Sequence, residues 1–192
     1  MTVGAIVLVG GRARRMAGAA KPLLEVGGRT LLDRTVSALT DAGCLPIIVA
    51  GPVLDDRLPV RWVREDPPFA GPVAGIAAAL AAMPEPEPEW TLVLAGDLPH
   101  ADAIVGRLTA RLADAADAVV FTADAHPQWL AGAYRTAALR TAVGPADVTG
   151  ASCRAVLGGL DIAWLTDEDG ITADIDTPAD LTRVRAALEE EQ

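Results

Sequence analysis

Short apolar runs alternate with stretches of helical spacing along most of the chain. The first run, residues 3–9, is long enough for a strand that is buried on both faces. Further apolar runs predict strands at 45–50, 60–63, 90–95, 118–122 and 162–165. Helical patterns occupy 30–39, 72–83, 104–113, 136–143 and 152–157, and a last helix opens at 177–178. This alternation predicts an α/β fold.

Local signals mark where some of these helices begin and end. Thr30 with Asp33, and Thr177 with Asp180, have the spacing of a capping box, and Gly43 ends the first helix. The segment 84–89, Pro-Glu-Pro-Glu-Pro-Glu, cannot be helical, because proline lacks the backbone N–H that a helix needs. We expect a stiff, exposed connector there; the alternative is a segment that docks on a partner.

Length and composition narrow the class of protein. The chain has 192 residues, which predicts one domain spanning residues 1–192. No apolar run reaches the ~18–20 residues that a membrane span needs, and the sequence has no basic and apolar leader of the secretory kind. The two cysteines, Cys44 and Cys153, are too few for a disulfide scaffold. We therefore expect a cytoplasmic protein whose thiols are reduced.

The charge balance excludes one class of partner and singles out one residue. Sixteen basic residues stand against 26 acidic ones, a formal net charge of −10, whereas a general nucleic-acid binder needs a basic surface. The basic set contains 15 arginines and one lysine, Lys21. The one lysine is therefore a candidate functional residue.

Lys21 ends a basic, glycine-containing loop that follows the first strand. Four of the 16 basic residues lie between positions 12 and 21, and Gly10 and Gly11 let the backbone come close to a bound ring or phosphate. Loops at the carboxyl ends of parallel strands are where open α/β sheets bind ligands. A Walker loop is excluded because Pro22 follows the lysine, and the glycine spacing excludes a dinucleotide fingerprint. The alternative is a basic surface loop without a ligand.

Five motifs in order along the chain carry a resemblance to a known family. Residues 8–21 (Leu-x-Gly-Gly-x-x-x-Arg-Met-x-Gly-x-x-Lys) resemble the signature loop of the molybdenum cofactor nucleotidyltransferases, and most closely the guanylyltransferase (MobA) type. Residues 71–75, 94–99, 126–127 and 174–178 resemble that family's Gly-Pro-Leu-Ala-Gly turn, Cys-Asp-x-Pro metal site, His-Pro segment and Asn-x-Asn-Thr-Pro close.

The resemblance implies a fold and a reaction. The expected fold is a Rossmann-like, three-layer nucleotidyltransferase fold with a mostly parallel central sheet. The expected reaction is the Mg²⁺-dependent transfer of GMP from GTP to molybdopterin, with release of pyrophosphate. GTP and molybdopterin are then the small-molecule partners, and molybdoenzymes or other proteins of the cofactor chain are candidate protein partners.

The reaction requires positioning and positive charge rather than a protein nucleophile, because a substrate phosphate oxygen is already an anion. Arg15 and Lys21 supply positive charge, with Arg12 or Arg14 as weaker helpers. Asp97 follows the apolar strand 92–95, which makes it the first candidate for Mg²⁺ and a catalytic residue; the alternative is a cap of the next helix.

The second candidate metal ligand and the nucleotide contacts rest more heavily on the resemblance. Asp174 is the second metal candidate, with Asp176 as the competing choice, although Asp176 also suits a helix start. The candidate nucleotide contacts are Leu8, Val9, Gly10, Gly11, Lys21, Asp66, Gly71, Gly75 and Asp97. A solvated loop charge is the alternative for Asp66, and turn or helix packing is the alternative for the glycines at 71 and 75.

Departures from the family pattern keep other functions open. Ala20 replaces the acidic residue that often precedes the lysine, Gly96 replaces the cysteine before the metal aspartate, and 174–176 reads Asp-Ile-Asp, a form common in cytidylyltransferase relatives. The alternatives are a cytidylyltransferase or another small-phosphate nucleotidyltransferase, and an inactive nucleotide-binding protein that docks through 84–89.

The remaining aromatic and imidazole side chains are expected to be structural. His126, before Pro127, is expected to be structural or to face the substrate, and His100 to lie in a first helical turn. Four tryptophans fall in apparent strands, Trp129 in the apolar strand that follows His126-Pro127, and this favours core positions over ligand contacts: Trp62, Trp90, Trp129 and Trp164.

Overall fold

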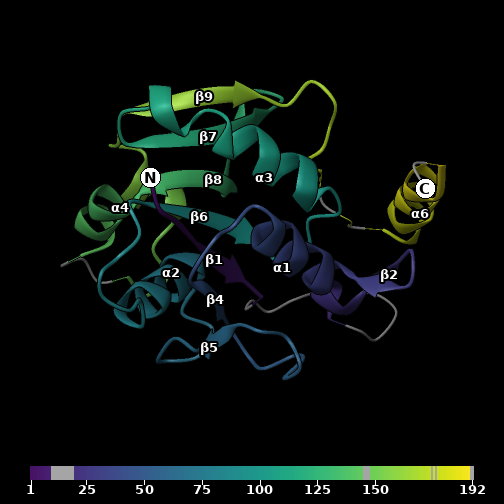
Figure 1. Cartoon of the computed structure of the whole chain (residues 1–192), viewed down its shortest axis with the longest axis horizontal. Coiled ribbons are helices and arrows are strands. Elements are labelled where there is room, and N and C mark those ends of the chain that lie inside the picture. Colours follow the sequence, from purple (N-terminus) through teal and green to yellow (C-terminus); the bar gives the residue numbers. More distant parts are fainter. Residues whose placement is uncertain (10–19, 145–147, 174, 176, 191–192) are drawn as a thin grey trace.

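A seven-stranded sheet forms the middle of the molecule in the order β5-β4-β1-β6-β8-β7-β9 (Figure 1), which confirms the α/β fold. The computed structural model describes residues 1–9, 20–144, 148–173, 175 and 177–190. The strands of the sheet are β1 (Val3–Leu8), β4 (Ile47–Ala50), β5 (Arg61–Val63), β6 (Trp90–Ala95), β7 (Ala118–Ala123), β8 (His126–Arg135) and β9 (Ile162–Thr166). A separate hairpin consists of β2 (Glu25–Val26) and β3 (Arg29–Thr30).

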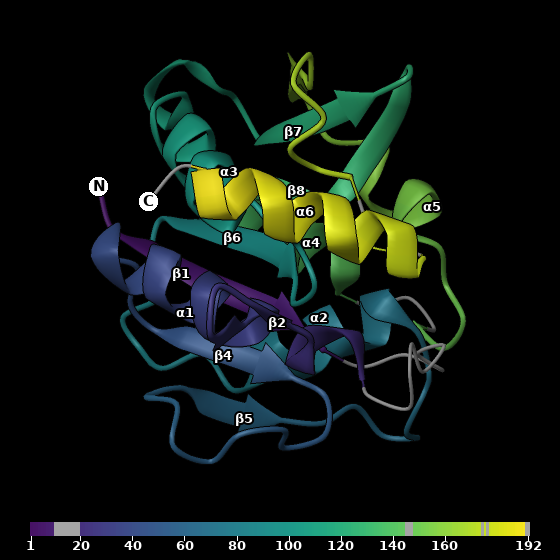
Figure 2. The same ribbon diagram turned by 90° about the vertical axis from the view of Figure 1, so that its right-hand side faces the viewer.

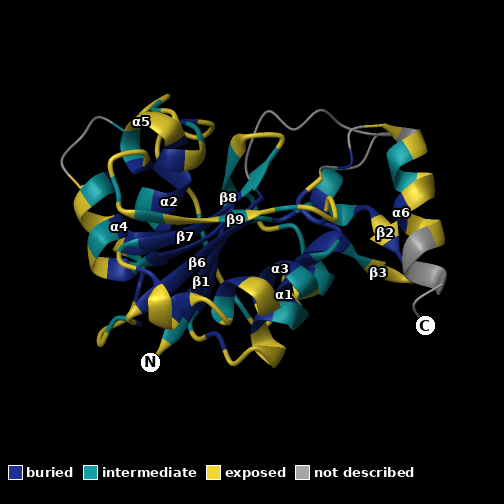
Figure 3. Ribbon diagram, turned by 90° about the horizontal axis from the view of Figure 1, so that it is seen from above, coloured by how far each residue is buried: buried dark blue, intermediate teal, exposed yellow. Residues whose placement is uncertain are grey.

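Helices cover both faces of this sheet and make three layers, as Figure 3 shows. One face is covered by α1 (Leu31–Asp41) and α3 (Ala101–Thr109), and the other by α2 (Pro72–Ala81), α4 (Thr136–Val143) and α5 (Cys153–Leu157). Alternate residues of β1 enter the two cores: Val7 packs in the first and Ile6 in the second. A strand that is buried on both faces must be apolar throughout, which explains the unbroken run of residues 3–9.

The sheet is mostly parallel, with β8 as the antiparallel strand. Strands β5, β4, β1 and β6 pair in parallel, β8 runs antiparallel to both β6 and β7, and β9 pairs in parallel with β7. Asp124 and Ala125, both with positive φ, make the tight turn that reverses the chain between β7 and β8. The carboxyl ends of β1 and β6 therefore lie side by side at one edge.

Several predicted boundaries differ from the observed ones, most of all both ends of α3. Helix α3 spans Ala101–Thr109 rather than 104–113, and a short 3-10 turn, Leu112–Asp114, follows it. Its first turn contains Asp102, whose charge suits a helix N-terminus although it adds nothing to the apolar pattern. Strand β4 begins at Ile47 rather than 45, because Pro46 has no N–H to donate to a neighbouring strand.

The helix caps agree with the sequence. The Thr30 hydroxyl accepts a hydrogen bond from the Asp33 amide at 3.1 Å. At the start of α6 (Pro178–Glu190), the Thr177 amide and hydroxyl both donate to the Asp180 carboxylate at 2.8 Å, and the Asp180 amide donates back to the hydroxyl. The start of α6 therefore has the reciprocal bonding of a capping box, whereas the start of α1 has the hydroxyl cap alone.

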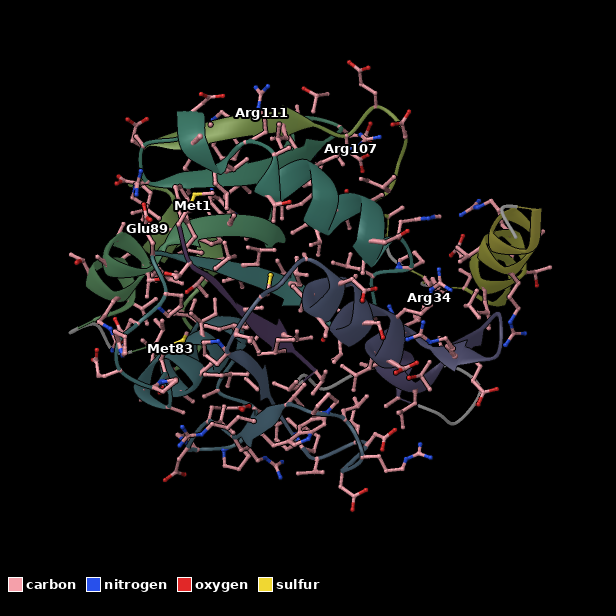
Figure 4. The ribbon with its side chains drawn as sticks, viewed as in Figure 1. Met1, Arg34, Met83, Glu89, Arg107 and Arg111 are labelled. Atoms are coloured by element: carbon pink, nitrogen blue, oxygen red, sulfur yellow. The ribbon has the colours of Figure 1, made fainter. Side chains whose placement is uncertain are left out.

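The segment 84–89 is irregular, as expected, but it is held more firmly than a solvated connector. The Glu87 carboxylate pairs with Arg140 of α4, and the Glu89 carboxylate pairs with Arg135 at 2.9 Å. Pro88 is buried, and the Glu89 amide donates to the Thr2 hydroxyl at 3.0 Å. Figure 4 shows Glu89 close to Met1, so this segment packs along the amino-terminal side of the sheet.

The four tryptophans do not share one environment. Trp90 is fully buried, whereas Trp62 and Trp129 are half-buried. The core position expected for Trp164 is wrong: the side chain is 48% exposed, because β9 is the edge strand of the sheet. Membership of a strand predicts burial only where a neighbouring strand or helix covers it.

Helix α6 lies beyond the carboxyl-terminal edge of the sheet, beside β2 (Figures 1 and 2). It packs on the hairpin through a small apolar cluster formed by Leu24, Val26, Leu31, Ile175 and Val184. The Arg185 guanidinium donates to the Glu25 carbonyl at 3.0 Å. No helix within the described ranges has the length and apolarity that crossing a membrane requires.

The ends of β1 and β6 meet in a contact that tolerates no larger residue. Gly96 donates its amide to the Leu8 carbonyl at 2.9 Å, and Val9 donates to the Ala50 carbonyl at 3.0 Å. A Cβ at position 96 would lie 2.6 Å from Cγ1 of Val9. Position 96, where the family pattern has a cysteine, is a glycine in this chain, and the missing Cβ leaves room for the Val9 side chain.

Replacing Gly96 by alanine is expected to lower the free energy of unfolding by about 1–3 kcal/mol, because the new methyl group collides with Val9. Trimming Val9 removes that collision. In urea denaturation, the double variant Gly96→Ala/Val9→Ala should therefore lose less stability than the sum of the two single losses.

Gly106→Ala is the matched control, because nothing lies within 4 Å of a Cβ at this helical glycine. It should gain roughly 0.5–1 kcal/mol. Strictly additive effects at positions 9 and 96 would contradict the steric coupling.

Candidate functional site

A cavity of about 780 Å³ opens at the carboxyl ends of β1 and β6. Leu8 and Val9 line it from β1, and Ala95 and Asp97 line it from the end of β6. Lys21 lines the cavity as well. Four of the residues that the sequence singles out, at positions 8, 9, 21 and 97, therefore face one space, although 89 positions separate the first from the last.

Lys21 opens a short 3-10 helix, Lys21–Leu23, at the rim of this cavity. Pro22 occupies its first turn, where the fixed φ of proline is suitable and its missing N–H costs nothing. The Leu24 amide donates to the Lys21 carbonyl at 3.0 Å. The proline that excludes a Walker loop thus fixes the backbone on which the lysine sits.

Asp97 is half-buried two residues beyond the end of β6 and contributes to the cavity wall. The N-cap position of α3 is His100, three residues further along the chain. The alternative reading of Asp97 as a helix cap is therefore wrong. Its carboxylate lies where the apolar strand ends, so the scaffold presents a hard oxygen donor to the cavity.

Two of the three remaining nucleotide candidates in the described ranges lie near the cavity. Gly71 is the N-cap of α2 with a φ of 102°, and a Cβ there would lie 3.9 Å from Cα of Gly150, which lines the cavity. Gly75 is buried one turn later, where a Cβ would lie 3.0 Å from Cδ2 of Leu8. The position of Gly75 thus serves the close packing of α2 on β1.

Asp66 does not line the cavity. It is exposed in the loop before α2, whereas its neighbour Glu65 is buried and accepts a hydrogen bond from the Phe69 amide at 2.9 Å. The same loop approaches the cavity through Ala70, whose carbonyl accepts from the Gly150 amide at 2.7 Å. Asp66 therefore stands at the periphery of the site.

A further part of the cavity wall is not predicted by the sequence. This wall consists of residues 128–131 of β8 and residues 150–154 leading into α5. A small-residue run at 150–152 directly before a helix, and a glutamine and a tryptophan interrupting an apolar strand, are the sequence signals that point to it. Neither resembles a known motif, so both are recognised only once the chain is folded.

Thr172 adds a fixed polar group to the cavity. Its amide and hydroxyl donate to the Asp167 carboxylate at 2.8 and 2.6 Å, and the Ile171 amide donates at 3.0 Å. Burial alone would raise the pKa of Asp167, but these hydrogen bonds outweigh it and lower the pKa. The Asp167 charge is therefore stable at neutral pH, and it holds the loop in place.

Neither thiol is an activated nucleophile. Cys153 lines the cavity but is buried, and burial raises the pKa of its thiol; burial likewise raises the pKa of Cys44 to about 11. Both cysteines are free, as expected. A neutral, buried thiol does not support covalent catalysis at neutral pH.

Several candidate residues lie outside the described residues: Gly10, Gly11, Arg12, Arg14, Arg15, Asp174 and Asp176. Within the described part of the chain, no three His, Cys, Asp or Glu side chains come together as a metal site. Asp97 therefore stands as a single carboxylate, which is compatible with Mg²⁺, because this ion is usually held by one or two carboxylates together with substrate phosphates.

Comparison with known proteins identifies the family. The MobA-like NTP transferase domain matches residues 5–163. A protein from Opitutus terrae named probable molybdenum cofactor guanylyltransferase is 38% identical over 140 residues, 71% of this chain and 68% of that protein. A protein of the same name from Synechococcus elongatus is 38% identical over 52% of this chain, which spans about half (53%) of its length.

A solved structure shares the fold. The structure of molybdopterin-guanine dinucleotide biosynthesis protein A from Archaeoglobus fulgidus aligns with a TM-score of 0.68 at 23% identity, covering 99% of this chain and 100% of that one. The match to the family spans most of the chain, from β1 into β9, and includes the strands that build the cavity. The chain therefore belongs to the MobA-like NTP transferase family and is an enzyme of the nucleotidyltransferase type, as the signature loop indicates.

Proposed function

We propose that this enzyme transfers GMP from GTP to the phosphate of molybdopterin, in the cytoplasm, and releases pyrophosphate. The observation that carries the proposal is the meeting of Lys21 and Asp97 in one cavity at the carboxyl ends of β1 and β6. The names of the guanylyltransferase relatives support the choice of GTP and molybdopterin.

The reaction is an in-line displacement at phosphorus. An oxygen of the acceptor phosphate forms a bond to the α-phosphorus of GTP, the bond from that phosphorus to the bridging oxygen of the β-phosphate breaks, and pyrophosphate leaves with the electron pair. The attacking oxygen is anionic at neutral pH, so the enzyme needs no general base for it. What the chain supplies is orientation and positive charge around the transferred group.

Lys21 meets that demand from the rim of the cavity. Its ammonium is a mobile point charge on a long side chain, which suits the phosphate oxygens whose charge rises during transfer. Pro22 and the 3-10 turn hold the backbone from which it extends. Arg15 is proposed to add a second positive charge from the preceding loop.

Asp97 is the proposed ligand of Mg²⁺, with Asp174 as the proposed second ligand. When bound, Mg²⁺ neutralises charge on the triphosphate and the departing pyrophosphate. Asp97 fits this role because it is half-buried, sits at a strand end and lines the cavity. The apolar residues that line the same cavity, among them Leu8 and Leu98, lower the local dielectric constant and strengthen its interaction with a cation.

The alternative of an inactive docking protein loses support in the segment 84–89. Glu87 and Glu89 are already paired with arginines of the same chain, and Pro88 is buried. Pro84, Glu85, Pro86 and Glu89 are exposed, and of the three glutamates only Glu85 makes no ion pair with an arginine of the described chain. The segment is therefore better explained as a connection that binds β8 through Glu89 and α4 through Glu87.

Lys21→Ala is expected to lower kcat by roughly 10²–10³-fold, because a charge-assisted contact to a reacting phosphate is lost. The midpoint of thermal unfolding should not change, since the lysine lies at the rim and not in the core. Lys21→Arg is the matched control and should retain a substantial part of the rate. Turnover of the alanine variant at the wild-type rate would remove Lys21 from the mechanism.

Asp97→Asn is expected to abolish most of the Mg²⁺-dependent rate, because the change preserves shape but removes a formal charge from a hard-cation site. The measurement is pyrophosphate release as a function of Mg²⁺ concentration. Asp114→Asn, an exposed carboxylate outside the cavity, is the control. An unchanged Mg²⁺ dependence in Asp97→Asn would refute the metal assignment.

GTP should exceed CTP in kcat/KM by about 5- to 150-fold, since a mismatched hydrogen-bonding edge costs ~1–3 kcal/mol. The segments 10–11 and 71–75 have the guanylyltransferase form, and their small residues leave room for a purine. The Asp-Ile-Asp form of 174–176 favours CTP instead. Side-by-side kinetics with molybdopterin decide between them, and equal values or a CTP preference would overturn the assignment of GTP.

A further inference from the structure

The wall of the cavity formed by β8 is built on an irregularity of the sheet. Val120 of β7 pairs with Gly132 of β8, but the next residue, Phe121, pairs with Gln128. Two consecutive residues of β7 therefore pair with residues of β8 that are four positions apart, and residues 129–131 of β8 lie between the two pairs. Bulges of this kind redirect side chains and are common next to active sites.

The bulge changes which residues reach the cavity. A regular strand sends successive side chains to opposite faces, so that only every second residue could line a space on one side. Here Gln128, Trp129, Leu130 and Ala131 all line the cavity in succession. The irregularity thus gives the cavity four consecutive residues of β8, Trp129 among them, where a regular strand would give it two.

Tyr134 stabilises the bulge through contacts with Trp129 and Gly132. Its hydroxyl donates a hydrogen bond to the Trp129 carbonyl at 2.8 Å. Its ring lies against Gly132, where a Cβ would come within 3.0 Å of it. Burial raises the pKa of Tyr134, so its hydroxyl stays protonated and continues to donate at neutral pH. The backbone at position 129 is therefore fixed.

Trp129 is also supported at its ring. The indole of Trp164 in β9 meets it in a T-shaped contact, with ring centroids 6.0 Å apart and an angle of 72° between the planes. Trp129 is nevertheless only half-buried. A rigid, partly exposed aromatic ring in a cavity is suited to stack on a flat ligand at little entropic cost.

Arg154 adds an uncompensated charge to the same wall. It is exposed at the start of α5 and lines the cavity. Its guanidinium makes no hydrogen bond or ion pair with any residue that the structure describes. Arg107, Arg135 and Arg140 show the contrast, since each is paired with a carboxylate. A planar guanidinium facing a cavity is suited to bind a phosphate through two parallel hydrogen bonds.

The order of the strands places this wall on the side of β6 that faces away from β1. In the order β4-β1-β6-β8, the signature loop follows β1, Asp97 follows β6, and Trp129 lies on β8. Asp97 thus lies between the end of β1, from which the signature loop departs, and the wall that contains Trp129. Transfer between two substrates requires them to approach the reacting phosphorus from different sides.

We propose that Trp129 and Arg154 form the acceptor subsite, in which Trp129 stacks on a fused heteroaromatic ring of the pterin class and Arg154 binds the acceptor's phosphate. The proposal rests on the proposed function for the identity of the acceptor. It adds Trp129 and Arg154 as specificity-determining residues, and neither lies within any of the five motifs of the sequence.

Equilibrium binding to three probes tests the subsite: hydroxymethylpterin, which has no phosphate, molybdopterin, and GTP with Mg²⁺. Trp129→Leu keeps an apolar side chain but removes the stacking surface. It should raise the Kd of both pterins about tenfold or more and leave the Kd of GTP unchanged. Trp129→Phe retains a ring and should restore most of the binding.

Arg154→Gln tests the contribution of the phosphate to binding separately from that of the ring. It should raise the Kd of molybdopterin about tenfold and leave that of hydroxymethylpterin unchanged. Arg111→Gln is the matched control, because Figure 4 shows this arginine at the periphery and it does not line the cavity. Thermal unfolding of each variant verifies that the fold is retained.

The outcomes separate this inference from the proposed function. If the wild-type protein binds neither pterin, the proposed acceptor is wrong, and the subsite loses its ligand class with it. If the wild-type protein binds both pterins and Trp129→Leu binds them equally well, the acceptor subsite is wrong while the proposed function stands. A loss of GTP affinity in Trp129→Leu would assign the wall to the nucleotide and overturn the inference.

Discussion

The close contact between Val9 and Gly96 is the constraint on which the geometry of the site depends. Two hydrogen bonds extend the sheet beyond the last residue of β1, from Val9 to Ala50 and from Gly96 to Leu8. They fit only because position 96 has no Cβ, which would come within 2.6 Å of Val9. The signature loop therefore departs from a fixed point beside Asp97, and a shift there would separate the loop from the proposed metal ligand.

The elements of this fold are readable from the sequence where burial is nearly complete. Residues 3–9 are apolar without a break because both faces of β1 are covered, and Thr30 caps α1 through a local hydrogen bond. Such features depend on residues close together in the chain. Lys21 and Asp97, which line the cavity, are also recognisable from the sequence. Lys21 is the one lysine of the chain, and Asp97 lies two residues beyond the end of a buried strand.

The opposite wall of the cavity depends on contacts that no local pattern carries. The bulge of β8 is a relation between two strands, visible only when Phe121 is paired with Gln128. Gly150 reaches the cavity because its amide binds the carbonyl of Ala70, 80 positions earlier in the chain. The exposure of Trp164 likewise follows from the place of β9 at the sheet edge, which strand patterning alone does not reveal.

The distribution of charge explains how an acidic protein can handle anionic substrates. A net charge of −10 repels extended polyanions such as nucleic acids, whose charges meet the whole surface. At physiological ionic strength that repulsion is screened within about 8 Å. Inside the cavity the nearest charges decide instead, and there Lys21 and Arg154 add two positive charges to the negative charge of Asp97. The residues that line the cavity therefore carry more positive than negative charge, although the chain as a whole is acidic.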